Sequence, residues 1–302
     1  MRGLRVACLQ NAPAHGCVRE NIARADALLQ ARSADMEGVQ LLVLPEMAFM
    51  GYQWRSKEHI DEVLDDGGAL TLEWCKQTAK RLGCVVCCGL ARRSMRRRLN
   101  SMVVAGPDGQ LVDTIDKTHL YATDKTWAEA GDGFQSRYVV PGLPIGPVGF
   151  GICMDINPRD FQVPRPYFQA PPDDYEFAMY HLNAGSRLIV FSSAWCRNHP
   201  DDVPEAYVEK DDAQVSAETL SAWLRRLEPL RGQDVHFVCA DRVGEEPLRL
   251  LGKDSELRTR FSGTSCVISL KDASVLKALS ASEEGILVVD IPLSGGFPST
   301  EV

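Results

Sequence analysis

Three residues of reactive type stand where predicted β-strands end, and Cys153 is the most informative of them. The segment 146–158 reads GPVGFGICMDINP, in which an alternating apolar run stops at the thiol. This alternation predicts a strand, and glycines within a strand let another part of the chain approach closely. A nucleophile on a tight turn after a strand is open to substrate, as in the α/β-hydrolase serine elbow. Cys153 is therefore a candidate nucleophile, although a buried core thiol would give the same local pattern.

The other two strand ends carry Glu46, after the apolar run 39–44, and Lys117, after LVDTID. A cysteine attacks as a thiolate and so needs a nearby base or positive charge. A glutamate whose pKa is raised by burial can act as that base, and a lysine can stabilise thiolate and oxyanion. His119 is the nearest histidine that could pair with the thiol instead. The strand ends predict a site built from a glutamate, a lysine and a cysteine.

The motifs LPEMAFMGY, DKTHL and GICMD, in this order, resemble those of the nitrilase superfamily of carbon–nitrogen hydrolases. The resemblance implies that Cys153 is the nucleophile and Glu46 the general base. It implies that Lys117 stabilises the oxyanion together with the backbone N–H of Met154. It also implies a second glutamate after the lysine, and Glu129 is the candidate for orienting Lys117. The implied reaction is hydrolysis of a nonpeptide C–N bond through a thioester, with no metal or other cofactor.

The pattern of elements predicts an α/β fold. Strand pairs joined directly, as around the turn Pro107-Asp108-Gly109, alternate with strands separated by helices. This order favours two sheets sandwiched between helices in one domain, 1–302, with surface insertions near 159–174 and 197–215. The resemblance implies a four-layer αββα sandwich and a possible homodimer. Helices are expected at 18–32, 69–82, 174–184 and 216–230.

The composition excludes several classes of protein. The chain has 302 residues, of which 45% are hydrophobic and 25% charged, as is ordinary for a globular protein. A net charge of −8 argues against a nucleic-acid partner, and the basic run 92–98 reads as a solvated hairpin loop. No stretch is long and apolar enough for a membrane span, and no signal core follows Met1. We expect an intracellular, cytoplasmic protein whose ten cysteines stay reduced.

The residues that follow Cys153 in its motif indicate which substrate the enzyme would accept. Its form CMDINP resembles the superfamily branch that deamidates N-terminal Asn and Gln of proteins in the N-degron pathway. Because Asn157 stands where many members have an arginine, Asp155 could bind the α-ammonium group of such a substrate; capping of the turn by Asp155 is the alternative. Tyr52, Trp54 and Trp195 are candidates for lining the groove of the peptide. The expected partners are peptides and proteins that begin with Asn or Gln.

The sequence is also compatible with three other functions. The chain could be a superfamily amidase acting on a free small molecule, of the ω-amidase or carbamoylase type. It could instead bind a metal or act in redox chemistry through Cys84, Cys87 and Cys88, although no matching second pair or histidine cluster accompanies them. It could also be an inactive scaffold, which the presence of Glu46 and Lys117 beside the Cys153 motif disfavours.

Overall fold

The computed structural model describes residues 3–159, 174–197, 210–247 and 258–293. Two six-stranded sheets form its centre, in the orders β14-β1-β2-β3-β4-β5 and β13-β12-β9-β8-β7-β6. The first sheet contains β1 (Gly3–Gln10), β2 (Leu41–Val43), β3 (Val85–Ser94), β4 (Arg97–Ala105), β5 (Leu111–Asp116) and β14 (Gly285–Pro292). The second contains β6 (Gln135–Arg137), β7 (Val148–Ile152), β8 (Leu188–Ser193), β9 (His236–Asp241), β12 (Cys266–Ser269) and β13 (Ser274–Ala278). A separate small ribbon pairs β10 (Glu245–Pro247) with β11 (Arg258–Arg260).

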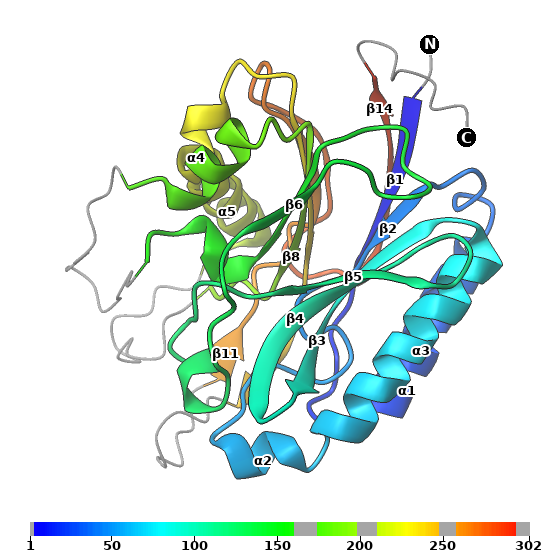
Figure 1. Cartoon of the computed structure of the whole chain (residues 1–302), viewed down its shortest axis with the longest axis vertical. Coiled ribbons are helices and arrows are strands. Elements are labelled where there is room, and N and C mark those ends of the chain that lie inside the picture. The colour runs from blue at the N-terminus through cyan, green and yellow to red at the C-terminus, as the bar shows by residue number, and fades with distance from the viewer. Residues whose placement is uncertain (1–2, 160–173, 198–209, 248–257, 294–302) are drawn as a thin grey trace.

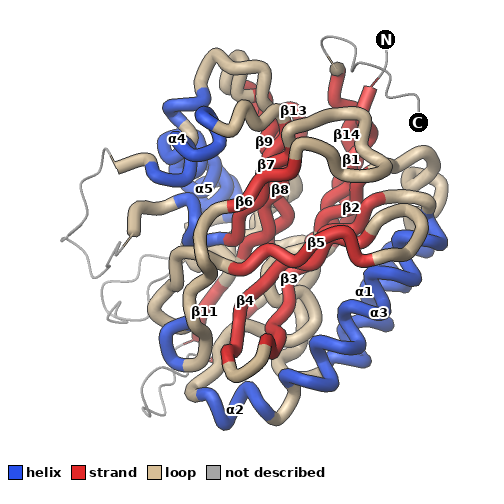
Figure 2. The backbone as a smooth tube through the Cα atoms, in the orientation of Figure 1, coloured by secondary structure: helices blue, strands red, loops and turns tan. Residues whose placement is uncertain are grey.

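Helices cover the outer face of each sheet, so that the molecule has four layers (Figures 1 and 2). On the first sheet lie α1 (Val18–Ala31) and α3 (Leu64–Leu82), preceded by the short α2 (Lys57–Asp61). On the second lie α4 (Glu176–Asn183) and α5 (Asp212–Arg226). The predicted single-domain αββα sandwich is confirmed.

Three apolar clusters fill the three spaces between the layers. In β1 the side chains of Val6 and Cys8 join the cluster between the sheets, whereas Ala7 and Leu9 join the cluster under α1 and α3. The third cluster, which includes Trp223 of α5, lies between the second sheet and its helices. Strands covered on both faces must be apolar on both, which explains the continuous apolar runs in the sequence.

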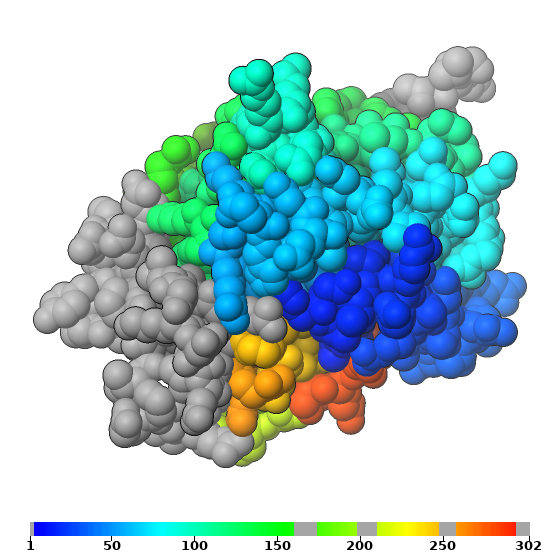
Figure 3. All heavy atoms as spheres, turned by 90° about the horizontal axis from the view of Figure 1, so that it is seen from below, coloured from blue at the N-terminus to red at the C-terminus, as the bar shows by residue number. Residues whose placement is uncertain are grey.

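The sandwich brings the ends of parallel strands together. Within the first sheet β1, β2 and β3 are parallel, and within the second β7, β8 and β9 are parallel. The two sheets meet at this edge, where the backbone N–H of Glu46 donates to the carbonyl oxygen of Ser193 at 3.3 Å. Figure 3 looks onto this end from below, and its centre is covered by the light-blue residues that include α2.

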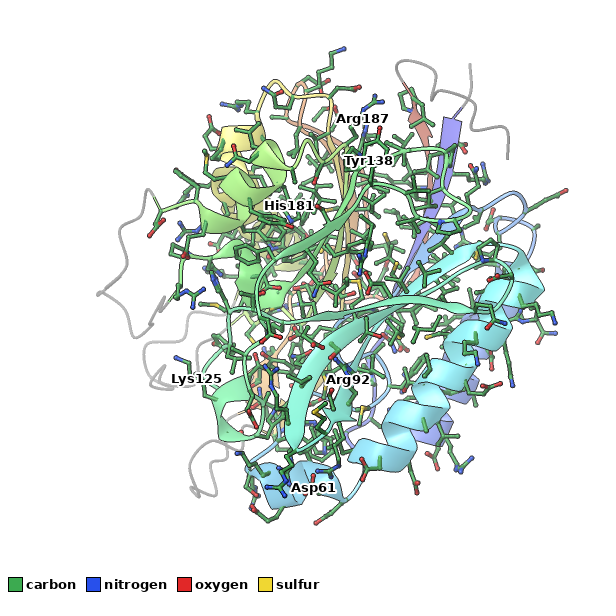
Figure 4. The ribbon with its side chains drawn as sticks, in the orientation of Figure 1. Asp61, Arg92, Lys125, Tyr138, His181 and Arg187 are labelled. Carbon is green, nitrogen blue, oxygen red and sulfur yellow. The ribbon has the colours of Figure 1, made fainter. Side chains whose placement is uncertain are left out.

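The basic run 92–98 forms the tip of the β3–β4 hairpin, as predicted, with Met95 97% exposed in the turn, and arginines on the flanking strands form ion pairs. Arg93 and Arg98 both pair with Asp61 of α2, and Arg92 pairs with Asp116 of β5 at 2.8 Å. Figure 4 labels Arg92 and Asp61 near this end of the hairpin. These arginines tie the hairpin to its neighbours, because acidic side chains on α2 and β5 face them.

Most of the two predicted insertions, near 159–174 and 197–215, lies outside the described residues. The part that is described begins α5 earlier than the helix predicted at 216–230. Asp211 accepts a hydrogen bond from the N–H of Gln214 and caps the helix at Asp212. None of the helices in the described ranges is long and apolar enough to cross a membrane.

Candidate active site

Cys153 stands on a sharp turn directly after β7. Its φ of 45° lies in the left-handed region, which is rare for a residue with a side chain. The strand can approach α4 closely because Gly149 and Gly151 lack side chains: a Cβ at Gly151 would lie 2.5 Å from the ring of Phe177. A 3-10 turn, η2 (Cys153–Ile156), follows at once. The predicted strand and tight turn are both present, and backbone strain of this kind is often found at functional sites.

Lys117 and Glu46 meet in a fully buried ion pair. The Lys117 Nζ atom lies 2.6 Å from Glu46 Oε1, and both side chains have 0% exposure. Glu46 keeps its second oxygen, Oε2, without a hydrogen-bond partner within the described residues. The structure thus brings together the ends of two segments 71 positions apart in the sequence and leaves one carboxylate oxygen for a reacting group.

Two further residues complete this cluster and were missed in the sequence. Asp124, in the 3-10 turn η1 (Asp124–Thr126), accepts a hydrogen bond from Lys117 Nζ at 2.6 Å. Asn100 of β4 donates from Nδ2 to Glu46 Oε1 at 2.6 Å and to Asp124 Oδ1 at 3.1 Å. The one available signal was a polar residue inside the apolar strand that contains Asn100. In Figure 4 the neighbouring Lys125 points outward, away from the cluster.

Glu129 does not reach Lys117. Its side chain is 45% exposed and pairs with Arg97 at 3.7 Å. The reason is the path of the loop after Lys117, since the backbone N–H of Glu129 already donates to the carbonyl of Arg98 on the hairpin. The second carboxylate that orients Lys117 is therefore Asp124, which lies seven residues after the lysine.

The charges of the cluster define the protonation of the resting site. Burial raises the pKa of Glu46, against the lowering effect of Lys117. Burial would lower the pKa of Lys117, but Asp124 and Glu46 outweigh it and raise that pKa. Burial and the charge of Glu46 raise the pKa of the Cys153 thiol well above its ordinary value. The arrangement combines a thiol of raised pKa, a charged lysine and a carboxyl group with one open oxygen, so that Cys153 must lose its proton as it attacks.

An oxyanion site can form between Lys117 and the turn after Cys153. Met154 is the second residue of η2 and is buried. The first N–H groups of a helical turn have no partner within it and can donate to an anion. The Met154 N–H and the Lys117 ammonium are therefore the donors available for negative charge that develops beside the thiol.

Asp155 is a structural residue of the elbow, and the proposed ammonium contact is corrected. Its Oδ1 accepts the backbone N–H groups of Thr118 and His119, at 2.9 and 2.8 Å, and its Oδ2 accepts that of Ile152 at 2.9 Å. Burial raises its pKa to about 7, against these hydrogen bonds. Both oxygens are occupied in joining the elbow to the loop after Lys117, so capping of the turn is the observed role.

Asn157 also helps to join the elbow after Cys153 to the loop after Lys117. Its carbonyl oxygen lies 2.8 Å from Nδ1 of His119, and its Oδ1 accepts from Nε of Arg226 at 3.2 Å. His119 is thereby held at the end of the elbow, and its Nδ1 has a partner other than the thiol.

The three aromatic residues predicted to line a groove have different surroundings. Tyr52 is buried against the cluster, with its ring centroid 5.6 Å from Lys117 Nζ. Trp54 is instead a packing residue, since it is buried against His15 at 4.1 Å between ring centroids and donates its indole N–H to the carbonyl of Gly51. Trp195 is half-buried against Trp223, at 5.9 Å between ring centroids. Tyr52 and Trp195 remain candidates for substrate contact.

Replacing Asn100 by leucine tests its role in positioning Glu46. The Asn100 hydrogen bond lowers the pKa of Glu46, so its loss should raise that pKa. Because Glu46 must be deprotonated to act as a base, the acid limb of kcat/KM should move to higher pH, and kcat/KM at neutral pH should fall by about 10- to 100-fold. Asn21→Leu is the matched control, because Asn21 bonds backbone groups at Ala14 and Phe49 and should leave the limb unmoved. An unchanged limb in Asn100→Leu would contradict the assignment.

The fold and this cluster define a class of protein, and comparison with known sequences agrees. The family model for carbon-nitrogen hydrolases matches residues 5–161, and the chain belongs to this family. It is 29% identical to the protein N-terminal amidase of Schizosaccharomyces pombe, over 95% of this chain and 99% of the relative. It is 27% identical to a nitrilase of Pyrococcus abyssi, over 91% of this chain and 84% of the relative.

Solved structures agree on the fold. An N-terminal amidase crystallised with an Asn-Glu-Ala peptide superposes with a TM-score of 0.74 at 16% identity, covering 96% of this chain and 97% of the other. A carbon-nitrogen hydrolase from Helicobacter pylori gives 0.73 at 20% identity, covering 96% of this chain and 90% of the other.

The cysteines considered for metal or redox chemistry belong to the core. Cys87 and Cys88 lie in β3, with Cys84 just before it, and burial raises the pKa of all three thiols. Buried free cysteines of this kind behave as small apolar core residues. In the described ranges no group of three or more His, Cys, Asp or Glu side chains could hold a metal ion.

Proposed function

We propose that this enzyme hydrolyses the side-chain amide of N-terminal Asn or Gln in peptides and proteins, forming Asp or Glu and releasing ammonia. The observation that carries the proposal is the similarity to the fission yeast protein N-terminal amidase over nearly the full length of both chains. The buried Glu46–Lys117 pair at the Cys153 elbow supports it, because these groups suit attack on an amide carbon.

The reaction would proceed in two halves. The Cys153 sulfur attacks the side-chain amide carbon while Glu46 takes the thiol proton on its open oxygen. Lys117 and the Met154 N–H stabilise the oxyanion, which collapses as Glu46 returns the proton to the departing nitrogen. Ammonia leaves and a thioester remains. Glu46 then deprotonates a water molecule, which attacks the thioester and releases the acid and the thiol.

We place this activity inside the cell, where the product would enter the N-degron pathway. All ten cysteines are free, as fits a reducing compartment. A new acidic residue at the N-terminus differs from the original amide by one charge, which a recognition protein can distinguish.

Ammonia release from four matched peptides tests the proposal. The peptides begin with Asn, Gln or Asp, and the fourth carries Asn at an internal position only. We expect release from the first two and none above background from the others. Equal release from internal and N-terminal Asn would overturn the proposal, because no recognition of the chain start would then exist.

A second candidate is an amidase for a free small molecule. A segment of the chain is 32% identical to the 2-oxoglutaramate amidase of Bacillus subtilis, but this covers only 38% of the chain and 43% of the relative. The same assay with 2-oxoglutaramate and free glutamine decides between them. A higher kcat/KM on either compound than on the peptides would favour the small-molecule function.

A further inference from the structure

Five acidic side chains are buried in the described part of the chain, and four of them have compensating partners. Glu46 and Asp124 share Lys117, and Glu246 pairs with Arg242 at 2.5 Å. Asp155 receives three backbone N–H groups. The fifth is Asp241, the last residue of β9. A buried carboxylate normally requires an ionic or hydrogen-bonding partner for each oxygen, so that the surroundings of Asp241 call for an explanation. The complete set is Glu46, Asp124, Asp155, Asp241 and Glu246.

Asp241 has one occupied and one open oxygen. Its Oδ1 accepts the backbone N–H groups of Trp195 and Arg242, both at 2.9 Å. Its Oδ2 is buried and forms no hydrogen bond of full geometry with the described residues, although the nearby Ser193 side chain lowers the pKa of Asp241. The neighbouring Arg242 does not supply one, because its guanidinium pairs with Glu246 and lies over the ring of Phe261.

The strand register places Asp241 on the same row as the nucleophile. Ile152 pairs with Ser192 across β7 and β8, and Ser193 pairs with Asp241 across β8 and β9. Cys153, one residue after Ile152, is thus two strands from Asp241 at the same edge of the sheet. Adjacent strands are about 4.8 Å apart, so the two backbone positions are separated by roughly 10 Å. Burial raises the pKa of Asp241 well above its ordinary value, and the negative charge of Glu46 adds to this effect, as expected for groups at one edge.

We propose that Asp241 binds the α-ammonium group of the substrate's N-terminal residue through Oδ2. This assignment rests on the proposed function. It names the group that would make the enzyme specific for the N-terminal residue of its substrate. In N-terminal Asn, three bonds of about 1.5 Å each separate the amide carbon from the α-nitrogen. With a reacting sulfur about 3 Å from that carbon and an ammonium–carboxylate contact of about 2.8 Å, the substrate spans roughly 9 Å. That length is comparable with the roughly 10 Å between the two backbone positions that carry the thiol and the carboxylate.

The charge balance of the site supports this assignment. Glu46 and Asp124 share a single lysine, so together with Asp241 three buried acidic groups stand against one cation that pairs with two of them. A substrate ammonium beside Asp241 would favour its charged carboxylate form, whereas a peptide with an internal Asn brings no such group. A carboxylate that binds this desolvated cation would therefore let the enzyme distinguish an N-terminal Asn or Gln from an internal one.

The test compares two peptides that differ only in the α-amino group. One begins with Asn, and in the other a succinamoyl group replaces that residue, which keeps the amide and removes the ammonium. Wild-type enzyme should prefer the first by about 100-fold or more in kcat/KM. Asp241→Asn should reduce this preference to near one by losing rate on the Asn peptide alone. Asp241→Glu, which keeps the charge, should retain part of the preference.

Asp155→Asn is the matched control, because it removes a buried carboxylate of the same sheet edge that is fully bonded to the backbone. It should lower both rates in proportion and leave the preference unchanged. Iodoacetamide labelling of Cys153 and thermal melting verify that each variant is folded with an accessible site. Three results would each overturn the assignment. The wild-type enzyme could cleave both peptides at equal rates, Asp241→Asn could keep the preference for the Asn peptide, or Asp241→Asn could lose rate on both peptides in proportion.

Failure of this assignment is distinguishable from failure of the proposed function. Wild-type release of ammonia from the Asn peptide tests the function alone. If the wild-type enzyme releases none, the proposed function fails and the assignment of Asp241 fails with it. If it is active and Asp241→Asn keeps its preference, only the assignment of Asp241 fails.

Discussion

Replacing Lys117 by methionine should abolish measurable ammonia release and lower the free energy of unfolding by about 3 to 5 kcal/mol. The lysine has no exposure and lies 2.6 Å from both Glu46 and Asp124, so its removal leaves two buried carboxylates without a cation. The same change removes an oxyanion donor, a loss that costs about 100- to 1000-fold in kcat by itself. Chemical denaturation and steady-state ammonia assays measure the two effects.

The loss of stability in Lys117→Met should depend on pH with a definite sign. Without the cation, buried carboxylates take up protons more readily in the folded state than in the unfolded state. Their pKa values are then raised on folding, so stability falls as pH rises through the range between the unfolded and folded values. The deficit relative to wild type should be smallest near pH 4 and largest above neutrality. A deficit that grows on acidification would contradict the charge assignment.

Lys125→Met provides the matched control for this variant. Lys125 is exposed and points away from the cluster in Figure 4, although it lies in the same turn as Asp124. Surface substitutions of this kind usually change stability by less than about 0.5 kcal/mol. Both activity and stability should therefore stay close to wild type.

Cys153→Ala should reduce kcat by about 10,000-fold or more while leaving the fold intact, because no thioester can form. The side chain removed is small, and the backbone turn with a φ of 45° is spanned by the hydrogen bond from the backbone N–H of Ile152 to Asp155 Oδ2. Mass spectrometry of wild-type enzyme quenched during turnover should find an acyl group on the peptide that contains Cys153, and none in the variant.

Cys17→Ala is the control for the general effect of losing a thiol. Cys17 is exposed and lies before α1, so this variant should keep full activity and one acylated cysteine. Residual amidase activity of Cys153→Ala above one per cent of wild type would be incompatible with the nucleophile assigned to this chain.

The candidate site could be predicted in part because its three reactive residues each follow a recognisable strand, which is an apolar run before Glu46 and Cys153. A strand covered on both faces is easily recognised, and the polar residue that ends it stands out, as with Glu46 after residues 39–44. The glycines of β7 were equally informative, since Gly149 and Gly151 leave room for His181 and Phe177 of α4. Local pattern was sufficient for these features.

Other members of the site carried no local signal. Asp124 and Asn100 come from a loop turn and a strand interior, and only the contacts with Lys117 and Glu46 distinguish them. Glu129 was the acidic residue expected to orient Lys117, but its backbone N–H is bonded to Arg98 of the hairpin and its side chain pairs with Arg97. For Asp155 the sequence left both substrate contact and capping of the turn possible, and three backbone N–H groups from two segments converge on it.

From the sequence alone, the apolar patterns predicted an α/β fold with two sheets between helices, and the three motifs, through their resemblance to carbon–nitrogen hydrolases, indicated the family and the candidate residues Glu46, Lys117 and Cys153. The tertiary structure alone decided which carboxylates are paired and which oxygen is left open. Pairing depends on distances of a few ångströms between segments far apart in the chain, such as Asn100 and Glu46, or Asp241 and Trp195. Inside the protein an unpaired polar oxygen is costly, so the open oxygens of Glu46 and Asp241 mark the places where proton transfer and substrate binding are expected.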